Sequence, residues 1–247
     1  MNWDEEKEKL GKEILGLLYD SNMIDTWYKS KPEGWILFSG LWSPLYINLR
    51  PLGSFPHILK KIGYALGRLI KEECENIDRL VGIASAGVPI ATAITLENNI
   101  PMCYTRKLEG IKSITDFQDK ISEYGQHNLV EGFFQEGDNI ALVDDLVTKL
   151  DSKLIALEQL KSEAIKRKIN INCKTIIVIL DREQGAEELA KKNRLKLNSL
   201  IPFNSKGIHW LKDKFSDIEN EIINDYLINT EKYQEKDIQE KLRNRKF

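Results

Sequence analysis

Residues 139–152 read NIALVDDLVTKLDS, and this stretch decides the fold class of the chain. Its apolar run from Ile140 to Val143 predicts a buried strand, which leads through two carboxylates and a loop into a helix ending near Lys168. The same order of apolar strand, short turn and helix recurs from Leu80 and from Ile176. This alternation predicts an α/β fold, with a mainly parallel sheet flanked by helices and ligands at the carboxyl ends of the strands.

The two carboxylates and the loop after them suit a phosphorylated sugar. Backbone N–H groups of the loop, the N-terminus of the next helix and the hydroxyls of Thr148 and Ser152 can hold a phosphate. Asp144 and Asp145 suit the hydroxyls of a ribose. An Asp at a strand end often only caps the next helix, and the residues alone leave both interpretations open.

Length and composition favour one globular unit. A chain of 247 residues with 42% hydrophobic and 30% charged residues can bury the core of one α/β domain with appendages. The formal net charge of −2 favours neither nucleic acid nor an anionic membrane as a partner. The charged N-terminus lacks the apolar core of a signal peptide and no aliphatic run could span a bilayer, so we expect a soluble, cytoplasmic protein.

The three cysteines do not form a recognisable framework. Cys74, Cys103 and Cys173 are odd in number and far apart. This spacing fits neither disulfides nor a metal site, so we expect buried or idle thiols in a reducing compartment.

The remaining segments predict helices near both ends and one long loop. Leucine and isoleucine at helical spacing predict helices over residues 4–24 and about 55–75, joined by short extended pieces. Residues 108–127 are polar and lack a strong period, which predicts a long mobile loop. Residues 206–247 are rich in Lys and Glu and predict a helical tail, for which we favour a solvated or oligomer-supporting role over partner binding.

The stretch 139–152 resembles the type I phosphoribosyltransferase fingerprint, a hydrophobic strand followed by Asp-Asp, two residues, Thr and then Gly-x-Ser. By this resemblance, Asp144 and Asp145 meet the ribose hydroxyls of phosphoribosyl diphosphate. The resemblance puts the 5′-phosphate on Thr148, Lys149, Leu150, Asp151 and Ser152. Leu150 stands at the glycine of the fingerprint, where a side chain can crowd the phosphate or forbid a positive φ.

Four further segments narrow the resemblance to the orotate phosphoribosyltransferases. Residues 38–50 resemble the hood over the base, and residues 82–93 resemble the loop whose backbone approaches the diphosphate. Residues 101–107 resemble the strand that ends in an Arg-Lys pair, and residues 179–186 resemble the segment whose arginine holds the orotate carboxylate. The matches follow the family's order and cover about residues 35–205.

The resemblance implies a set of site residues. The catalytic groups that it implies are Asp144, Asp145, Lys107 and Lys120. The further substrate-binding residues that it implies are Ser85, Ala86, Gly87, Arg106, Tyr124, Arg182, Tyr46, Ile47 and Phe38. Magnesium is the implied cofactor, held mainly through substrate oxygens and without a direct protein ligand.

Each segment also has an interpretation that needs no ligand. Arg106 and Lys107 can offset diphosphate charge, but two adjacent cations are more often solvated. Arg182 can grip a planar carboxylate with two hydrogen bonds, or join a surface ion-pair cluster with its acidic neighbours. The loop at Gly87 can admit a ligand or only pack tightly, and Tyr46 can stack on a base or belong to the core.

The departures from the family lie at ligand-contacting positions. Phe38 replaces a base-side lysine, and Ser122 stands where the lysine of the catalytic loop is expected. An insertion lengthens that loop, in which Lys112 or Lys120 is the substitute candidate and His127 has no assigned role.

The resemblance implies transfer of the phosphoribosyl group to orotate, giving orotidine 5′-phosphate and diphosphate in pyrimidine (UMP) biosynthesis. It implies a homodimer, because the mobile loop of family members reaches the neighbouring subunit's site, and it leaves an orotidine phosphate decarboxylase partner open. It divides the chain into an N-terminal helix with a base-covering hood (1–54), a phosphoribosyltransferase core (55–205) and a helical extension (206–247). The departures keep two alternatives, a phosphoribosyltransferase for another base and a non-catalytic phosphoribosyl diphosphate sensor of the same fold.

Overall fold

The computed structural model describes residues 1–37, 40–111, 113–121 and 127–244. Its strands are β1 (Ile24–Thr26), β2 (Trp35–Ile36), β3 (Trp42–Ser43), β4 (Leu45–Ile47), β5 (Arg79–Gly82), β6 (Met102–Thr105), β7 (Val130–Glu131), β8 (Asn139–Val147), β9 (Asn172–Asp181) and β10 (Lys196–Pro202). Its α-helices are α1 (Trp3–Asp20), α2 (Pro56–Glu73), α3 (Gly87–Asn98), α4 (Ile114–Lys120), α5 (Asp151–Arg167), α6 (Ala186–Lys192), α7 (Ile208–Trp210), α8 (Asp217–Ile228) and α9 (Lys236–Asn244). Short 3-10 helices cover Arg50–Ser54 and Thr230–Gln234, and a π-helical turn covers Phe203–Gly207.

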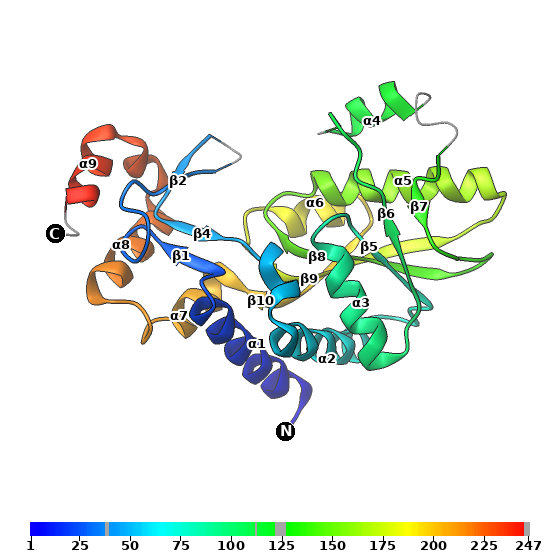
Figure 1. Ribbon diagram of the computed structural model, residues 1–247, viewed down its shortest axis with the longest axis horizontal. Helices are drawn as coiled ribbons and strands as arrows, with labels where there is room; N and C mark the ends of the chain where they lie inside the picture. The colour runs from blue at the N-terminus through cyan, green and yellow to red at the C-terminus, as the bar shows by residue number, and fades with distance from the viewer. Residues whose placement is uncertain (38–39, 112, 122–126, 245–247) are drawn as a thin grey trace.

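A six-stranded sheet forms the centre, in the order β10, β9, β8, β5, β6 and β7. Neighbouring strands run parallel except β7, which is antiparallel to β6. Figure 1 shows α5 on one side of this sheet and α1, α2 and α3 on the other. The α/β fold predicted from the alternation of strands and helices is therefore confirmed.

The two faces of the sheet are buried in separate apolar clusters, because side chains alternate along each strand. Leu80 and Ala141 belong to the cluster that includes the buried faces of α1, α2 and α3. Val81 and Leu142, one position further along, belong to the cluster that includes α5 and α6. Covered faces on both sides explain why these strands read as continuous apolar runs.

Strand β8 is longer than the apolar run predicts. It continues past Val143 to Val147, because Asp144, Leu146 and Val147 pair in parallel register with β9. The prediction of a loop directly after the two carboxylates is therefore wrong. Both carboxylates lie near the C-terminal end of β8. Only residues 148–150 connect this strand to α5.

The prediction of a loop throughout residues 108–127 is also wrong, since this segment contains α4. Ser113 and Asp116 form a capping box, in which each side chain accepts a hydrogen bond from the other's backbone N–H. Phe117 is buried, and α4 contacts α5. One buried aromatic residue and a good cap are enough to order a helix that the weak periodicity did not reveal.

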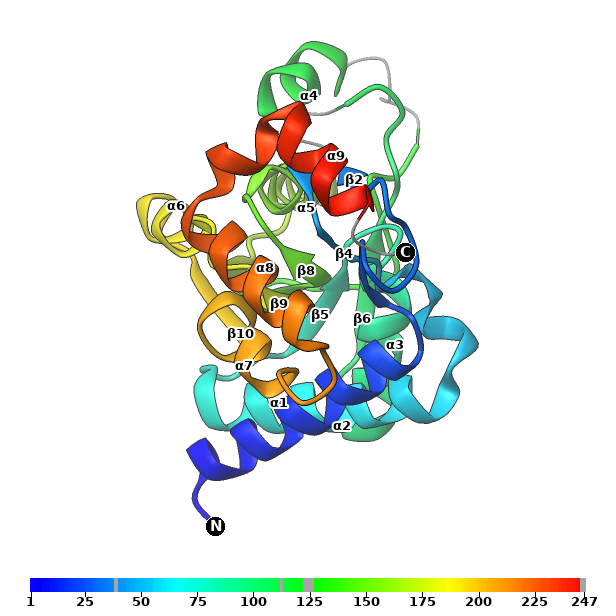
Figure 2. The ribbon, with the colours of Figure 1, turned by 90° about the vertical axis from the view of Figure 1, so that its left-hand side faces the viewer.

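The N-terminal hood and the C-terminal extension lie beside each other. The hood consists of the antiparallel pairs β1 with β4 and β2 with β3. Figures 1 and 2 show α8 and α9 next to these strands. Tyr226, Tyr233 and Leu242 of the extension are buried, so the solvated role expected for the tail is wrong, while the oligomer-supporting role stays a prediction.

The remaining expectations concern thiols and membrane segments. Cys74, Cys103 and Cys173 are free, and burial raises the pKa of each thiol. Among the described residues, no helix combines the length and the apolar character that crossing a membrane requires.

Candidate functional site

Backbone hydrogen bonds bring the predicted loops to one edge of the sheet. The bonds run from the Ile83 N–H to the Val143 carbonyl (2.9 Å), from the Ala84 N–H to Thr105 Oγ1 (3.0 Å) and from the Arg182 N–H to the Val147 carbonyl (3.0 Å). They join the ends of β5, β6, β8 and β9, which all point the same way. The carboxyl edge of a parallel sheet is where such folds bind ligands.

Gly87 allows the loop after β5 to approach β8 closely. A Cβ on Gly87 would lie 2.1 Å from the Val143 carbonyl oxygen, so no other residue fits without displacement. Gly87 is buried, Ala86 is half-buried and Ser85 is exposed. The glycine thus serves tight packing, while Ser85 is the loop residue that a ligand can reach.

A buried lysine from α5 holds the first carboxylate of the pair. Lys153 Nζ donates to Asp144 Oδ2 (2.7 Å) and to the Leu146 carbonyl (2.7 Å), and it lies 3.3 Å from Ser152 Oγ. The side chains of Lys153 and Asp144 are 4% and 10% exposed. Because both charges are shielded from water, the pair fixes the orientation of Asp144.

The second carboxylate lies in a less favourable environment. Burial raises the pKa of Asp145 to about 6, and the charge of Asp144 acts in the same direction. Lys153 and a hydrogen bond from the Leu146 N–H (2.7 Å) act in the opposite direction. A ligand hydroxyl or cation that contacts Asp145 would therefore stabilise the charged form of a carboxylate that burial disfavours.

Replacing this carboxylate should reveal the cost of burying it. A carboxyl group with a raised pKa stabilises the folded state below its unfolded pKa of about 4, and this contribution is lost as pH rises through about 6. We therefore expect Asp145→Asn to be more stable than the parent protein by about 2 kcal/mol above about pH 7, after allowance for partial exposure. Urea unfolding of both proteins between about pH 4 and about pH 7.5 measures the difference. The same difference at both ends of that range would contradict the raised pKa.

The loop after β8 leads into α5 without a side-chain cap. Leu150 is the N-cap residue with φ −97°, and its side chain accepts no hydrogen bond from the first turn of α5. The Leu150 side chain is buried in the cluster of α5 and α6. The backbone here thus needs no positive φ, contrary to the concern raised by the missing glycine. An uncapped helix N-terminus suits an anion, and half-buried Thr148 and exposed Lys149, Asp151 and Ser152 surround it.

The basic pair lies exposed at the end of β6. The backbone of Arg106 is fixed, because its N–H donates to the Leu129 carbonyl (3.0 Å) and its carbonyl accepts from Gln159 Nε2 (2.8 Å). Its guanidinium is 3.8 Å from Glu131 Oε1 and 45% exposed, and Lys107 is exposed as well. A rigid backbone therefore presents two cations to solvent at the ligand edge.

Arg182 is buried, and its Nε has no hydrogen-bond partner among the described residues. Burial lowers the pKa of Arg182, while Tyr226 acts in the opposite direction. Its acidic neighbours bind elsewhere: Asp181 accepts from the Glu183 N–H (2.8 Å), and Glu183 accepts from the N–H and the hydroxyl of Ser205 (2.7 Å each). The surface ion-pair alternative is therefore wrong, and a buried guanidinium with a spare donor suits a carboxylate ligand.

The predicted hood residues are found on β4. Tyr46 and Ile47 are half-buried, and Trp35 stacks on the ring of Tyr46 with centroids 5.6 Å apart and planes at 12°. One face of Tyr46 is thus already covered by an aromatic ring. Phe38, Lys112, Ser122 and Tyr124 lie outside the described residues.

Lys120 is not brought to the carboxylate pair by any contact that the structure describes. It is half-buried at the end of α4, and a Cβ on Gly110 would lie 3.2 Å from its Nζ. The Lys120 amine therefore lies close to the backbone at Gly110, within the same segment.

Lys153 is the site residue that sequence reasoning missed. It lies in the first turn of α5, where the helix dipole disfavours a cation. The sequence did hold a signal for it, a lysine at an unfavourable helix position shortly after two carboxylates. Such a lysine can be buried only if a carboxylate offsets its charge.

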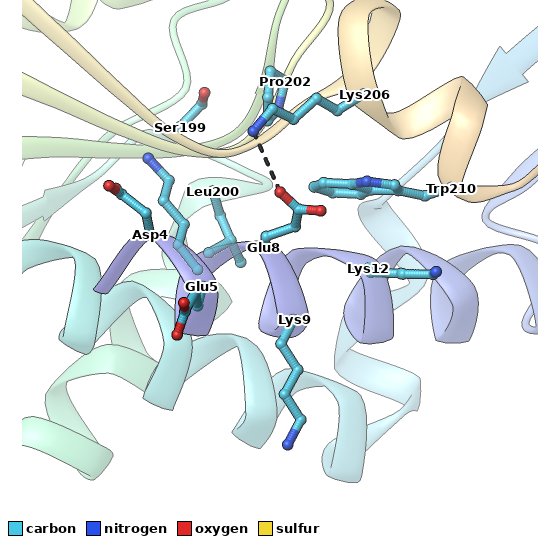
Figure 3. A pocket seen from close by; sticks show the side chains of 11 residues that line it. Asp4, Glu5, Glu8, Lys9, Lys12, Ser199, Leu200, Pro202, Lys206 and Trp210 are labelled. Atoms are coloured by element: carbon cyan, nitrogen blue, oxygen red, sulfur yellow. Dashed lines mark ion pairs between the residues drawn. The ribbon is translucent and has the colours of Figure 1, made fainter. Parts of the chain in front are cut away.

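A groove lies away from these residues. It has a volume of about 840 Å³ and lies between α1 and β10, at the opposite edge strand from β7. Figure 3 shows Glu8 and Lys206 facing one another across it, with nitrogen and oxygen 3.6 Å apart, beside Trp210. Lysines and carboxylates both line the groove and their charges offset each other, so the groove favours neither an anionic nor a cationic ligand.

The chain is similar in sequence to curated orotate phosphoribosyltransferases. The enzyme of Pyrococcus horikoshii is 32% identical over 197 residues, which are 78% of this chain and 91% of that protein. The enzyme of Methanothermobacter thermautotrophicus is 30% identical over 194 residues, 78% of this chain and 92% of that protein. No protein-family model matches the chain.

Solved structures show the same fold. The UMP synthase of Leishmania donovani superposes with a TM-score of 0.70 at 23% identity, over 87% of this chain and 42% of that longer protein. The orotate phosphoribosyltransferase of Aeropyrum pernix superposes with a TM-score of 0.63 at 21% identity, over 81% of this chain and 97% of that one. The type I phosphoribosyltransferase fold expected from the sequence is confirmed.

Proposed function

The chain belongs to the orotate phosphoribosyltransferase family, and from that premise we propose that it transfers the phosphoribosyl group of phosphoribosyl diphosphate to orotate. The products are orotidine 5′-phosphate and diphosphate, so the protein is a pentosyltransferase of UMP synthesis. One observation supports this best: the uncapped N-terminus of α5 adjoins Asp144 and Asp145 at the same sheet edge as the buried Arg182.

The donor substrate fits the β8 to α5 connection. The 5′-phosphate accepts hydrogen bonds from the first-turn N–H groups of α5 and from Thr148 and Ser152. The ribose hydroxyls donate to Asp145 and Asp144, and Lys153 keeps Asp144 turned toward them. This arrangement holds the sugar while its anomeric bond breaks.

The leaving group fits the loops after β5 and β6. Breaking the anomeric C–O bond moves negative charge onto the diphosphate, and exposed Arg106 and Lys107 offset it with charge-assisted hydrogen bonds. Ser85 and Ala86 bring backbone close to the diphosphate oxygens. Residues 108–127, with Lys120, cover the site and exclude water during transfer.

The acceptor base fits the space between Arg182 and the hood. Arg182 binds the carboxylate of orotate through its guanidinium. Tyr46 and Ile47 lie over the base. A base without a carboxylate, such as uracil, would leave the guanidinium desolvated and is a poor substrate for that reason.

Magnesium suits the oxygen donors present. Mg²⁺ is usually held by one or two carboxylates together with phosphate oxygens and water, and Asp144 and Asp145 are carboxylates of this kind. No group of three or more metal-ligating side chains is present in the part of the chain described here. We propose that substrate oxygens hold the ion and Asp145 supports it. When bound, it neutralises charge on the leaving diphosphate.

Assembly is part of the proposal. We propose a homodimer in which the segment 108–127 of one subunit covers the site of the other. The chain matches 35% of the bovine UMP synthase at 29% identity. A decarboxylase that consumes orotidine 5′-phosphate is the partner that this similarity suggests.

Diphosphate release tests the proposed reaction. We expect release from phosphoribosyl diphosphate when orotate and Mg²⁺ are added, and a loss of about 100-fold or more in the double variant Asp144→Asn, Asp145→Asn. Uracil in place of orotate serves as the specificity control and should give little release. A coupled colorimetric assay for diphosphate is sufficient.

The other outcomes identify the alternatives. Release with a different base, and none with orotate, would replace the acceptor in this proposal. Saturable binding of phosphoribosyl diphosphate without release for any base would make the protein a sensor of the same fold.

A further inference from the structure

One glutamine of the C-terminal extension binds the backbone of the hood. Gln234 Oε1 accepts from the Trp42 N–H (2.7 Å), and Gln234 Nε2 donates to the Trp42 carbonyl (3.2 Å). A further bond from Nε2 to the Thr230 carbonyl (3.0 Å) orients the amide. One side chain thus satisfies both backbone groups of Trp42, a residue of β3 in the hood.

Three aromatic rings exclude water from the contact between the extension and the hood. Tyr233 stacks on Trp42 with centroids 6.3 Å apart and planes at 6°. Tyr226 meets the edges of both rings, at 6.5 Å from Trp42 and 5.7 Å from Tyr233. All three residues are less than a tenth exposed, so the hydrogen bonds of Gln234 lie beside a contact from which water is excluded.

A second attachment holds the other half of the hood. Glu219 of α8 is buried and accepts a hydrogen bond from the Thr26 hydroxyl on β1. Its other oxygen accepts from the N–H (2.9 Å) and hydroxyl (2.7 Å) of Ser216. β1 pairs with β4, and Asp25 lies opposite Tyr46. The attachment of β1 to Glu219 therefore also holds the strand that carries Tyr46.

We propose that the C-terminal extension holds the hood in the position that binds the acceptor base, and that Gln234 is a positioning residue that acts through Trp42. This inference rests on the proposed function, because it assumes that the hood covers orotate. The attachments reach Thr26 and Trp42 of the hood, which the proposed function places over the base. The effect should therefore fall on orotate and not on phosphoribosyl diphosphate.

Two glutamines of the extension provide a matched test. Gln234→Met removes the amide that binds the hood, and Gln239→Met removes an amide that donates only to the Tyr233 carbonyl (2.9 Å) within the extension. Both variants keep the length of the side chain. We expect Gln234→Met to raise KM for orotate about tenfold, with kcat and KM for phosphoribosyl diphosphate within about twofold, and Gln239→Met to leave all three within about twofold. Hydrogen exchange of residues 33–47 should accelerate in Gln234→Met alone.

The outcomes separate this inference from the proposed function. Equal KM for orotate in the two variants, or a rise for both substrates together, overturns the positioning role of Gln234. Gln234→Glu keeps the acceptor for the Trp42 N–H but turns a carboxylate oxygen toward the Trp42 and Thr230 carbonyls, so it should raise KM for orotate as Gln234→Met does. If the parent protein does not use orotate, the proposed function fails, and the exchange of residues 33–47 still decides whether Gln234 holds the hood.

Discussion

Lys153→Met is expected to lower the free energy of unfolding by about 3 to 5 kcal/mol, because it leaves the buried carboxylate of Asp144 without its cation. The methionine keeps the volume of the side chain but none of the bonds to Asp144 and Leu146. Diphosphate release should fall about 100-fold, since a carboxylate that turns away from the ribose no longer positions it. Urea unfolding and the diphosphate assay measure the two effects.

The control for this prediction lies on the same helix. Lys161→Met removes a lysine that is 53% exposed and paired with Glu158, so its effect on stability should stay within about 0.5 kcal/mol. Adding Asp144→Asn to Lys153→Met should restore most of the stability, because the buried side chain at position 144 then carries no unpaired charge, while activity stays low. A double variant as unstable as Lys153→Met would show that the ion pair is not the source of the effect.

Arg182→Met is expected to raise KM for orotate about 100-fold and to leave KM for phosphoribosyl diphosphate within about threefold. Loss of two hydrogen bonds between a guanidinium and a carboxylate accounts for an effect of this size. Stability should stay equal or increase, because the variant no longer buries a guanidinium whose Nε has no partner among the described residues. Steady-state kinetics with each substrate varied in turn give the two constants.

A second arginine is the matched comparison. Arg106→Met should show the opposite division, with a higher KM for phosphoribosyl diphosphate and little change for orotate, because Arg106 is the residue proposed to bind the diphosphate. The preference for orotate over uracil should fall in Arg182→Met and persist in Arg106→Met. An equal rise of both KM values in Arg182→Met would remove its role in base binding.

The site was predictable where its residues directly follow a strand. Arg106 and Arg182 directly follow β6 and β9, and the resemblance to the family pointed to both; Asp144 was found at the end of the apolar run that marks β8. The extent of β8 was not predictable, since its last residues are polar and are held in the strand only by pairing with β9. Lys153 was missed because its ion pair with Asp144 forms only when both side chains are buried in the folded protein, and hydrophobic periodicity does not reveal such a pair.

The sequence by itself determined the fold class, the alternation of strands and helices in the core and the family, because periodicity and short motifs are local properties of the chain. Only the tertiary structure decided which charges are buried and which segments support the site. Gln234 and Trp42 are 192 residues apart, and no local pattern connects them. Their contact, like the burial that raises the pKa of Asp145, depends on how the whole chain packs, and for that physical reason it could be found only in the folded protein.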